Sequence, residues 1–265
     1  CSVSGEGPFI IYKDGYYYLF LSYGGLVAEG GYQIRIFRSE NITGPYVDEA
    51  GNSAVYTSQE NNLFTNIGVR IMGSYDWSGN RETRVAQGHN SAYVSEDGEI
   101  YMVYHSRFAE GKNGITEAHE VRVQQLFVNE AGWLVAAYEY TGEHISKTGY
   151  DMEQMCGEYE FIIHTPTTYY QKAGKATVGI MQPSHITLNE DGSVTGELTG
   201  SWTYEEGSPN MTITLEDITY QGVFLKLDLN AYRKFCEKLY FNQKQREVVM
   251  TFTVLGNNVT AWGSK

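Results

Sequence analysis

An internal repeat constrains the fold of this chain more than any other feature of its sequence. The segment EGPFIIYKDGYYYLFLSY (6–23) aligns without a gap with HNSAYVSEDGEIYMVYHS (89–106). In both copies an Asp-Gly pair, Asp14-Gly15 or Asp97-Gly98, separates two runs rich in aromatic and β-branched residues. Asp-Gly between such runs is a strong signal for a tight β-turn. Each copy is therefore predicted to be a β-hairpin.

The two copies continue in parallel beyond the hairpins. YQIRIFRS (32–39) corresponds to HEVRVQQLFV (119–128) as a third strand, and GPYVD (44–48) and GWLVAAYEY (132–140) are predicted as fourth strands. Repeated units of four antiparallel strands are typical of β-propeller blades. Two blades cannot close a propeller, which has four to eight. We expect the remaining blades to come from another segment, most simply an amino-terminal part of the same precursor.

The repeat ends near residue 147, and a second all-β domain is predicted over 148–265. Within it, 185–227 alternates short strand-like runs with turns, and 248–265 has the pattern of a closing hairpin. We expect a small barrel or sandwich. Only 229–239 has helical spacing, which predicts one short helix. The fold class is therefore all-β, with the last blades of a propeller followed by a small β-domain.

Composition limits the classes of partner. The chain of 265 residues carries 19 Lys+Arg against 32 Asp+Glu, a formal net charge of −13. Nucleic acid and anionic membranes repel such a surface, so we expect neither as a partner. No apolar run reaches 18 residues, so no membrane span is predicted. The 22 tyrosines suit β-sheets and also the C–H faces of sugars. The three cysteines are too few for a disulfide framework or a zinc site.

Two residues whose side chains can transfer protons occupy the same position in the two repeats. Glu6 and His89 each begin the first strand of a copy. The first strands of propeller blades are innermost, so their leading residues converge on the central axis. A carboxylate and an imidazole are therefore expected to lie close together there. The structural alternative makes Glu6 a turn residue between two glycines and His89 a hydrogen-bonded structural residue.

The same segments resemble a known family. SGEGPFIIYKDGYYYLFLSYGGL, GGYQIRIFRSENITGPYVD, GHNSAYV, YMVYHSRF and HEVRVQQLFVNEAGWLVAAYEY together resemble the second half of the glycoside hydrolase family 43 endo-arabinanases, that is, arabinan endo-1,5-α-L-arabinosidases. The resemblance covers nearly the whole chain. It implies a five-bladed propeller followed by a carboxy-terminal β-domain, and a secreted or periplasmic enzyme whose signal peptide is not in this chain.

The resemblance also implies roles for the two residues at the axis. Glu6 matches the general acid that protonates the leaving glycosidic oxygen in an inverting hydrolysis of arabinan. His89, in GHNSA, matches the histidine that organises calcium or another hydrated ion at the propeller centre, directly or through water. Calcium normally prefers oxygen ligands, so the position of this site is better supported than the direct contact.

One departure from the family pattern affects activity. The family uses an aspartate general base and a second aspartate that tunes the acid, both on earlier blades, and no segment here resembles their motifs. Asp14 and Asp97 lie in hairpin turns at the outer ends of strands and are poor substitutes. The chain alone is therefore expected to be inactive without an amino-terminal propeller fragment that supplies these groups.

Residues for binding arabinan or arabino-oligosaccharides have weaker support. Tyr23 and Tyr32 flank a glycine-rich loop, and Trp77 lies in the long polar connection 49–88, so all three are candidates for sugar contact. Arg107 is a candidate cleft residue, as are His105, His119 and Arg122. A structural role, as hydrogen bonds or ion pairs between strands, is the favoured alternative for this second group.

Two other functions remain open from the sequence. Cys1 could be the nucleophile of an amino-terminal hydrolase, with its own α-amino group as base. Such enzymes generally contain much helix, which this chain lacks. Alternatively, the chain belongs to a sugar-binding propeller that has the scaffold without catalysis. The missing blades distinguish this sugar-binding function from the arabinanase, because only the enzyme must supply two converging aspartates there.

Overall fold

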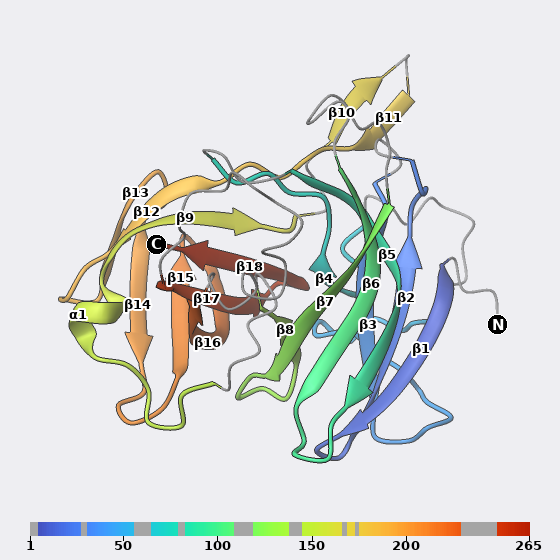
Figure 1. Cartoon of the computed structure of the whole chain (residues 1–265), viewed down its shortest axis with the longest axis horizontal. Helices are drawn as coiled ribbons and strands as arrows, with labels where there is room; N and C mark the ends of the chain where they lie inside the picture. The colour runs from blue at the N-terminus through green and yellow to red at the C-terminus, as the bar shows by residue number, and fades with distance from the viewer. Residues whose placement is uncertain are drawn as a thin grey trace, which may run out of the picture.

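The computed structural model describes nine segments of the chain, residues 5–27, 31–55, 65–78, 83–108, 119–137, 145–165, 169–172, 175–228 and 248–265. These segments are almost entirely β-structure, which confirms that the fold is all-β. Figure 1 shows two blade-like sheets on one side of the molecule and a barrel on the other. Among the described residues, no helix is long and apolar enough to cross a membrane. The number of propeller blades stays a prediction, as does the domain boundary after residue 147.

The first sheet contains β1 (Glu6–Lys13), β2 (Tyr16–Tyr23), β3 (Gln33–Ser39) and β4 (Val69–Met72) in sequence order. β1 and β2 form the predicted hairpin, closed by Asp14 at φ 48° and Gly15 at φ 91°. Two successive positive φ values are what the tight hairpin turn needs, and Asp-Gly supplies them at low steric cost. The predicted hairpin and third strand of this copy are confirmed.

The predicted fourth strand at 44–48 is wrong. The strand that pairs with β3 beyond the loop is β4, and the predicted segment contributes only Val47, which pairs with Arg38 as an isolated bridge. Pro45 has no N–H to donate, and Gly44 has a φ of 86°, so the segment cannot continue a ladder. The chain instead returns to the sheet about twenty-five residues later.

The second sheet contains β5 (Arg84–Val94), β6 (Ile100–Phe108), β7 (His119–Val128) and β8 (Leu134–Ala136), also in sequence order. β5 and β6 form the second predicted hairpin, and β7 has the predicted bounds. β5 carries two irregularities in its pairing with β6, and two non-glycine residues there, Ala86 and His89, have positive φ values of 55° and 50°. Irregularities of this kind change the direction in which side chains point, and strained backbone conformations are concentrated at functional sites.

The carboxy-terminal part is a closed antiparallel barrel. Its strands are β9 (Gly157–Ile163), β12 (Ser184–Leu188), β13 (Ser193–Gly196), β14 (Gly200–Tyr204), β15 (Asn210–Leu215), β16 (Ile218–Asp228), β17 (Val248–Gly256) and β18 (Val259–Ser264). They pair in this order, and β18 pairs with β9 to close the ring. Because the sheet closes on itself, this part of the chain is a barrel and not a sandwich. β10 (Tyr169–Lys172) and β11 (Lys175–Val178) form a separate hairpin, and α1 (Met152–Met155) is a single turn before β9. The helix predicted at 229–239 lies outside the described residues.

The barrel is joined to the first sheet through the β17–β18 hairpin. β18 lies parallel to β4 and pairs with it at Val259 and Arg70, so one hydrogen-bonded sheet runs from the blade into the barrel. Asn258 at the hairpin tip is 1% exposed. Its Nδ2 donates to Asp48 Oδ2 at 3.0 Å and to the Asn66 carbonyl at 2.8 Å, and its backbone N–H donates to Glu49. The hairpin tip is therefore anchored in the blade.

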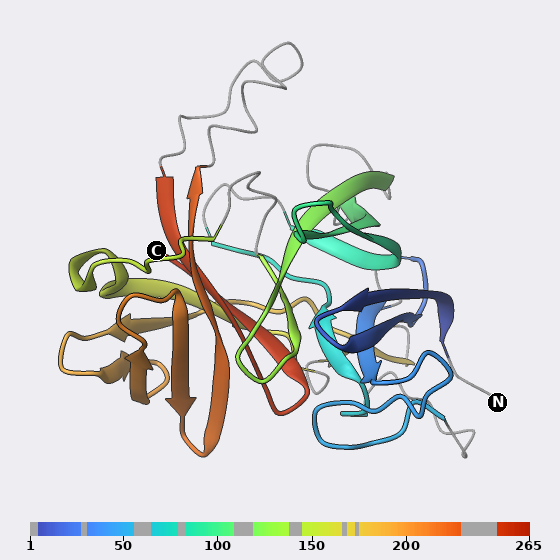
Figure 2. The same ribbon diagram turned by 90° about the horizontal axis from the view of Figure 1, so that it is seen from below.

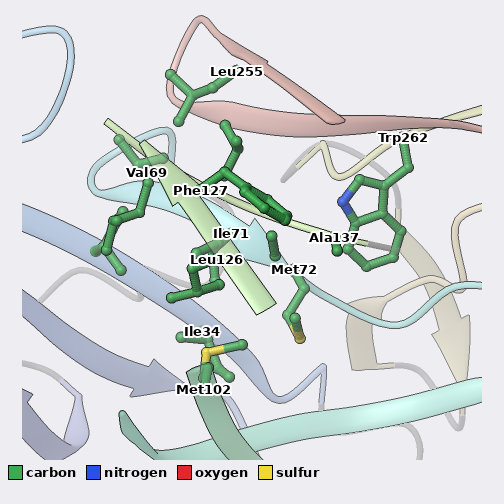
Figure 3. Packing of buried hydrophobic residues seen from close by; sticks show 14 of the residues in the cluster. Ile34, Val69, Ile71, Met72, Met102, Leu126, Phe127, Ala137, Leu255 and Trp262 are labelled. Carbon is green, nitrogen blue, oxygen red and sulfur yellow. The ribbon is translucent and has the colours of Figure 1, made fainter. Parts of the chain in front are cut away.

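One hydrophobic core unites both sheets and the barrel. Figure 3 shows Met72 and Ile34 of the first sheet, Phe127 of the second, and Trp262 and Leu255 of the barrel converging on the same cluster. The barrel interior forms a second cluster around Phe224 and Phe252. Figure 2 shows the two sheets as neighbouring twisted layers beside the barrel. The shared core fixes the relative position of β1 and β5, which carry Glu6 and His89. Glu6 begins β1 as predicted, whereas β5 begins at Arg84, five residues before His89, so the prediction that His89 begins its strand is wrong.

Candidate active site

The structure brings Glu6 and His89 together. Glu6 is the first residue of β1, and His89 lies at the second irregularity of β5. Glu6 Oε1 lies 3.9 Å from His89 Nδ1, and the two side chains are 54% and 59% exposed. The two side chains therefore converge, as the repeat predicts. Both groups face solvent, so a substrate can reach them.

Tyr32 connects the two residues. It immediately precedes β3, and its hydroxyl donates a hydrogen bond of 2.5 Å to Glu6 Oε1. The same hydroxyl oxygen lies 3.3 Å from His89 Nδ1. A phenol has a single proton, which goes to the nearer carboxylate oxygen, so the contact with His89 requires Nδ1–H as the donor. In this arrangement the Nε2 lone pair of His89 is left available to a ligand.

The ring of Tyr32 is held firmly in place. It is fully buried and stacks on His105, with ring centroids 5.4 Å apart and an interplanar angle of 22°. On another side it lies against Gly88, where an added Cβ would come within 2.0 Å of Tyr32 Cε1. Only glycine leaves room for the ring at that position. Burial and the hydrogen bond to Glu6 raise the pKa of Tyr32, against a smaller lowering by Ser22, so the phenol keeps its proton.

The backbone around the pair is also specialised. Gly7, directly after Glu6, has a φ of 59°, and a side chain there would contact the His89 ring at 3.3 Å. The backbone N–H of His89, itself in a left-handed conformation, donates to Ser22 Oγ at 2.7 Å. β2 thus supports the strained residue of β5. These contacts explain why glycines follow the acid and precede the histidine in the sequence.

A cluster of basic groups lies behind Tyr32. The rings of His105 and His119 have centroids 5.2 Å apart. Burial lowers the pKa of His105, with further lowering by the nearby charges of His119, Arg107 and His89. His105 is therefore neutral at neutral pH and acts as a flat surface for Tyr32. The favoured structural role for His105 agrees with this stacking.

The arrangement has the parts of an acid catalyst. One carboxylate oxygen of Glu6 accepts from Tyr32, while the carboxyl group as a whole stays half exposed. A protonated carboxyl in this position can give its proton to a bound oxygen from Oε2. The hydrogen bonds and ion pairs of the described residues bring no second carboxylate into this group.

Two of the predicted sugar-binding residues cannot stack on a sugar. Trp77 is 2% exposed and belongs to the core cluster shared by the sheets and the barrel, and Tyr32 is fully buried. Burial excludes the sugar stacking predicted for Trp77 and the subsite contact predicted for Tyr32. Tyr23 is 7% exposed, and the Arg35 guanidinium covers its ring at 4.7 Å. Arg107 lies near His105, and its contact with substrate stays a prediction.

Sequence reasoning missed the link that Tyr32 makes and the need for glycine at position 88. The signal available was indirect: a glycine directly before the predicted site histidine, and a tyrosine at the start of the third strand. Neither residue points to the other without the fold. Cys1 lies outside the described residues, so its proposed role as a nucleophile stays a prediction. Cys156 is a free thiol, and burial raises its pKa, which makes it a poor nucleophile.

The predicted ion site can be compared with the donors present. Among the described residues, no group of three or more His, Cys, Asp and Glu side chains is arranged to hold a metal ion. Calcium in a protein cage takes six to eight oxygens, so these residues do not form such a cage. The exposed His89 ring, whose Nδ1–H faces Tyr32, offers one nitrogen. This donor suits an ion that keeps most of its water shell.

Comparisons with known proteins find matches for both parts of the chain. Residues 3–134 match the glycosyl hydrolases family 43, and residues 137–263 match a C-terminal lipocalin-like domain associated with the same family. An extracellular endo-α-(1→5)-L-arabinanase from Bacillus subtilis is 38% identical over 98% of this chain and 52% of its own length. A second, from Thermotoga petrophila, is 37% identical with the same coverage. The chain spans about half the length of these curated relatives.

Solved structures give the same result. The crystal structure of the endo-1,5-α-L-arabinanase from Thermotoga petrophila matches with a TM-score of 0.81 and 35% identity, over 99% of this chain and 56% of that one. A glycoside hydrolase family 43 protein from Bacillus licheniformis matches with a TM-score of 0.80 and 34% identity, over 98% and 55% of the two chains. Both the two-sheet part and the barrel are included in these matches.

Proposed function

Because this chain belongs to glycosyl hydrolases family 43, we propose that it is the acid-bearing part of an enzyme that hydrolyses α-1,5-linked arabinan. Glu6 is the general acid. The observation that carries the proposal is the half-exposed Glu6 carboxyl at the start of β1, held by Tyr32 beside His89, which lies at the second irregularity of β5. The names of the two relatives that match 98% of the chain support arabinan as substrate and internal cleavage of the polymer.

The proposed reaction is a single displacement with inversion. The Glu6 carboxyl transfers its proton to the glycosidic oxygen as the bond from that oxygen to the anomeric carbon breaks. A water molecule attacks the anomeric carbon from the opposite face and gives its proton to a general base. We propose that this base, and an aspartate that tunes Glu6, are carboxylates on propeller blades outside this chain. In inverting enzymes the acid and the base lie about 6.5–9.5 Å apart, which leaves room for the water.

The ion at the propeller centre is part of the proposal. His89 would hold calcium or another hydrated ion through its Nε2, directly or through water. The charge of a bound ion would stabilise anionic groups and ordered water near the axis. The protein's own contribution is the orientation of the imidazole, which Tyr32 sets through Nδ1. The relatives are named as extracellular enzymes, and we propose that this enzyme is secreted as well.

Product analysis tests the function. The enzyme with all of its blades is incubated with linear α-1,5-arabinan and, as controls, with xylan and galactan. Reducing ends should appear only with arabinan, and proton NMR in the first minutes should show the β-anomer of the new reducing end. Release of the α-anomer first would refute inversion. Binding of arabino-oligosaccharides without any cleavage would favour the sugar-binding alternative.

The requirement for further blades has its own test. This chain alone should bind arabino-oligosaccharides weakly and release no reducing ends from arabinan. Activity should appear when the chain is combined with a polypeptide that supplies the remaining blades. If the purified chain alone has ordinary arabinanase activity, the proposal that the base lies on another segment is wrong.

A further inference from the structure

We propose that Tyr32 is the positioning residue for the acid, and that its hydroxyl fixes the proton to be transferred on Oε2 of Glu6. This inference rests on the proposed role of Glu6 as the general acid. Tyr32 itself makes no contact with substrate, because its side chain is fully buried. It acts through the 2.5 Å hydrogen bond to Glu6 Oε1.

The direction of the hydrogen bond carries the argument. Tyr32 donates its only proton to Glu6 Oε1, so Oε1 is an acceptor in both protonation states of the carboxyl group. A protonated Glu6 must then carry its own proton on Oε2. Without the hydroxyl, the proton would distribute over both oxygens and the carboxyl group would rotate.

The support around Tyr32 is what a positioning residue requires. Its ring is fixed by the stacked ring of His105 on one side and by Gly88 on the other. The contact of its hydroxyl oxygen with His89 Nδ1, at 3.3 Å, adds a second contact from β5, the strand that carries Gly88. Catalytic groups need to be held to about half an ångström by residues whose own rotamers are locked. Tyr32 meets this condition because both β5 and β6 contribute to its placement.

The variant Tyr32→Phe isolates the hydroxyl. Phenylalanine keeps the stacking on His105 and the packing on Gly88, and it removes the hydroxyl that donates to Glu6 and accepts from His89 Nδ1. A matched control is Tyr101→Phe, because Tyr101 also donates a 2.5 Å hydrogen bond to a carboxylate, Glu99 Oε2, at a hairpin turn. Both variants lose the same kind of bond. Only Tyr32→Phe loses it at the acid.

The experiment compares two leaving groups in the enzyme with all of its blades. Linear arabinan has a sugar alcohol as leaving group and needs a proton, whereas a 2,4-dinitrophenyl arabino-oligosaccharide releases a stable phenolate without one. On arabinan, Tyr32→Phe should lower kcat about 10- to 100-fold with KM within about twofold, part of the factor that general acid catalysis supplies. On the activated substrate the loss should disappear. Tyr101→Phe should be unchanged on both.

The outcomes separate this inference from the proposed function. Glu6→Gln, assayed in parallel, should be nearly inactive on arabinan and active on the dinitrophenyl substrate. If Glu6→Gln cleaves arabinan normally, the proposed function itself fails. If Glu6→Gln behaves as expected but Tyr32→Phe matches wild type on arabinan, or is equally impaired on both substrates, only the role of Tyr32 is overturned.

A spectroscopic measurement tests the geometry without activity. Nitrogen-15 NMR of the imidazole of His89 in this chain should show a proton on Nδ1 in the wild type. In Tyr32→Phe, His89 should shift toward the tautomer with the proton on Nε2, because the acceptor for Nδ1–H is gone. A wild-type His89 that carries its proton on Nε2 would contradict the hydrogen-bond arrangement from which the role of Tyr32 is inferred.

Discussion

Gly88→Ala should impair the enzyme through Tyr32 alone. The added Cβ would lie 2.0 Å from Tyr32 Cε1 and 2.2 Å from Cδ1, whereas carbon atoms in contact prefer about 3.5–4.0 Å. The ring must therefore withdraw by roughly 1.5 Å, since His105 stacks on it and the backbone of β5 is fixed by its pairing with β6. A shift of that size breaks the 2.5 Å bond from the Tyr32 hydroxyl to Glu6.

The expected magnitudes follow from overpacking and misplacement. Inserting a methyl group into a packed site costs about 1–3 kcal/mol in the free energy of unfolding. A misplacement of about 1 Å in a catalytic group costs on the order of 100-fold in rate. Gly88→Ala should therefore remain folded, with a measurable loss of stability in urea, and lose about 100-fold in kcat on arabinan.

A matched control separates this effect from a general intolerance of alanine. At Gly73 an added Cβ would meet nothing closer than 3.9 Å, and neither Gly73 nor Gly88 has a positive φ. Gly73→Ala should change stability and kcat little. If Gly88→Ala retains wild-type kcat, or if Gly73→Ala loses as much as Gly88→Ala, the steric argument about Tyr32 is refuted.

Three further predictions concern the joint between blade and barrel and the chemistry of the thiol. Burial, and secondarily the charge of Arg70, lowers the pKa of His164 to about 3 from an ordinary value of 6.5. Between these two pH values His164 takes up a proton only in the unfolded chain, so the folded state loses stability as the pH falls. Between pH 7 and pH 5 the free energy of unfolding of the wild type should therefore fall by about 2 kcal/mol. His164→Asn, which can still accept from the Gly73 N–H, should lack this pH-dependent loss in urea titrations. Equal pH dependence in the two proteins would contradict the prediction. Asn258→Gly should lower the free energy of unfolding by about 2–4 kcal/mol, because glycine tolerates the φ of 60° but leaves Asp48 and the Asn66 carbonyl without this donor. The same change at the exposed Asn257 should cost under about 1 kcal/mol. Similar losses in the two variants would argue against the anchoring role of Asn258. Cys156 should react with iodoacetamide more slowly than free cysteine at pH 8, because burial raises its pKa, and an equal or faster rate by mass spectrometry would be inconsistent with that environment.

Local chemistry explains what could be predicted from the sequence. Asp14-Gly15 and Asp97-Gly98 predict both hairpins because a turn between paired strands needs positive φ values, which Asp14 and Gly15 both supply in the first hairpin and Gly98 supplies in the second. The repeat predicts that Glu6 and His89 converge, since equivalent positions in successive blades lie at the same height near the axis. The structure places their side chains within 3.9 Å.

What could not be predicted depends on contacts between distant segments. The fourth strand of the first sheet is β4 rather than 44–48, because Gly44 and Pro45 interrupt the chain where the pattern looked strand-like. Trp77 is buried because β18 of the barrel and the two sheets share one core, which no local pattern reveals. The role of Tyr32 depends on Gly88 and His105, which lie more than fifty residues away in the sequence.

The most direct measurement of the central claim is kcat for Glu6→Gln on linear α-1,5-arabinan, in the enzyme with all of its blades. Glutamine keeps the shape of the side chain and accepts the Tyr32 hydrogen bond, but it has no proton to give to the leaving oxygen. We predict a loss of about 100- to 10,000-fold in kcat, the usual contribution of a general acid, with an unchanged melting temperature. A folded Glu6→Gln enzyme that cleaves arabinan at the wild-type rate would contradict the assignment of Glu6 as the acid.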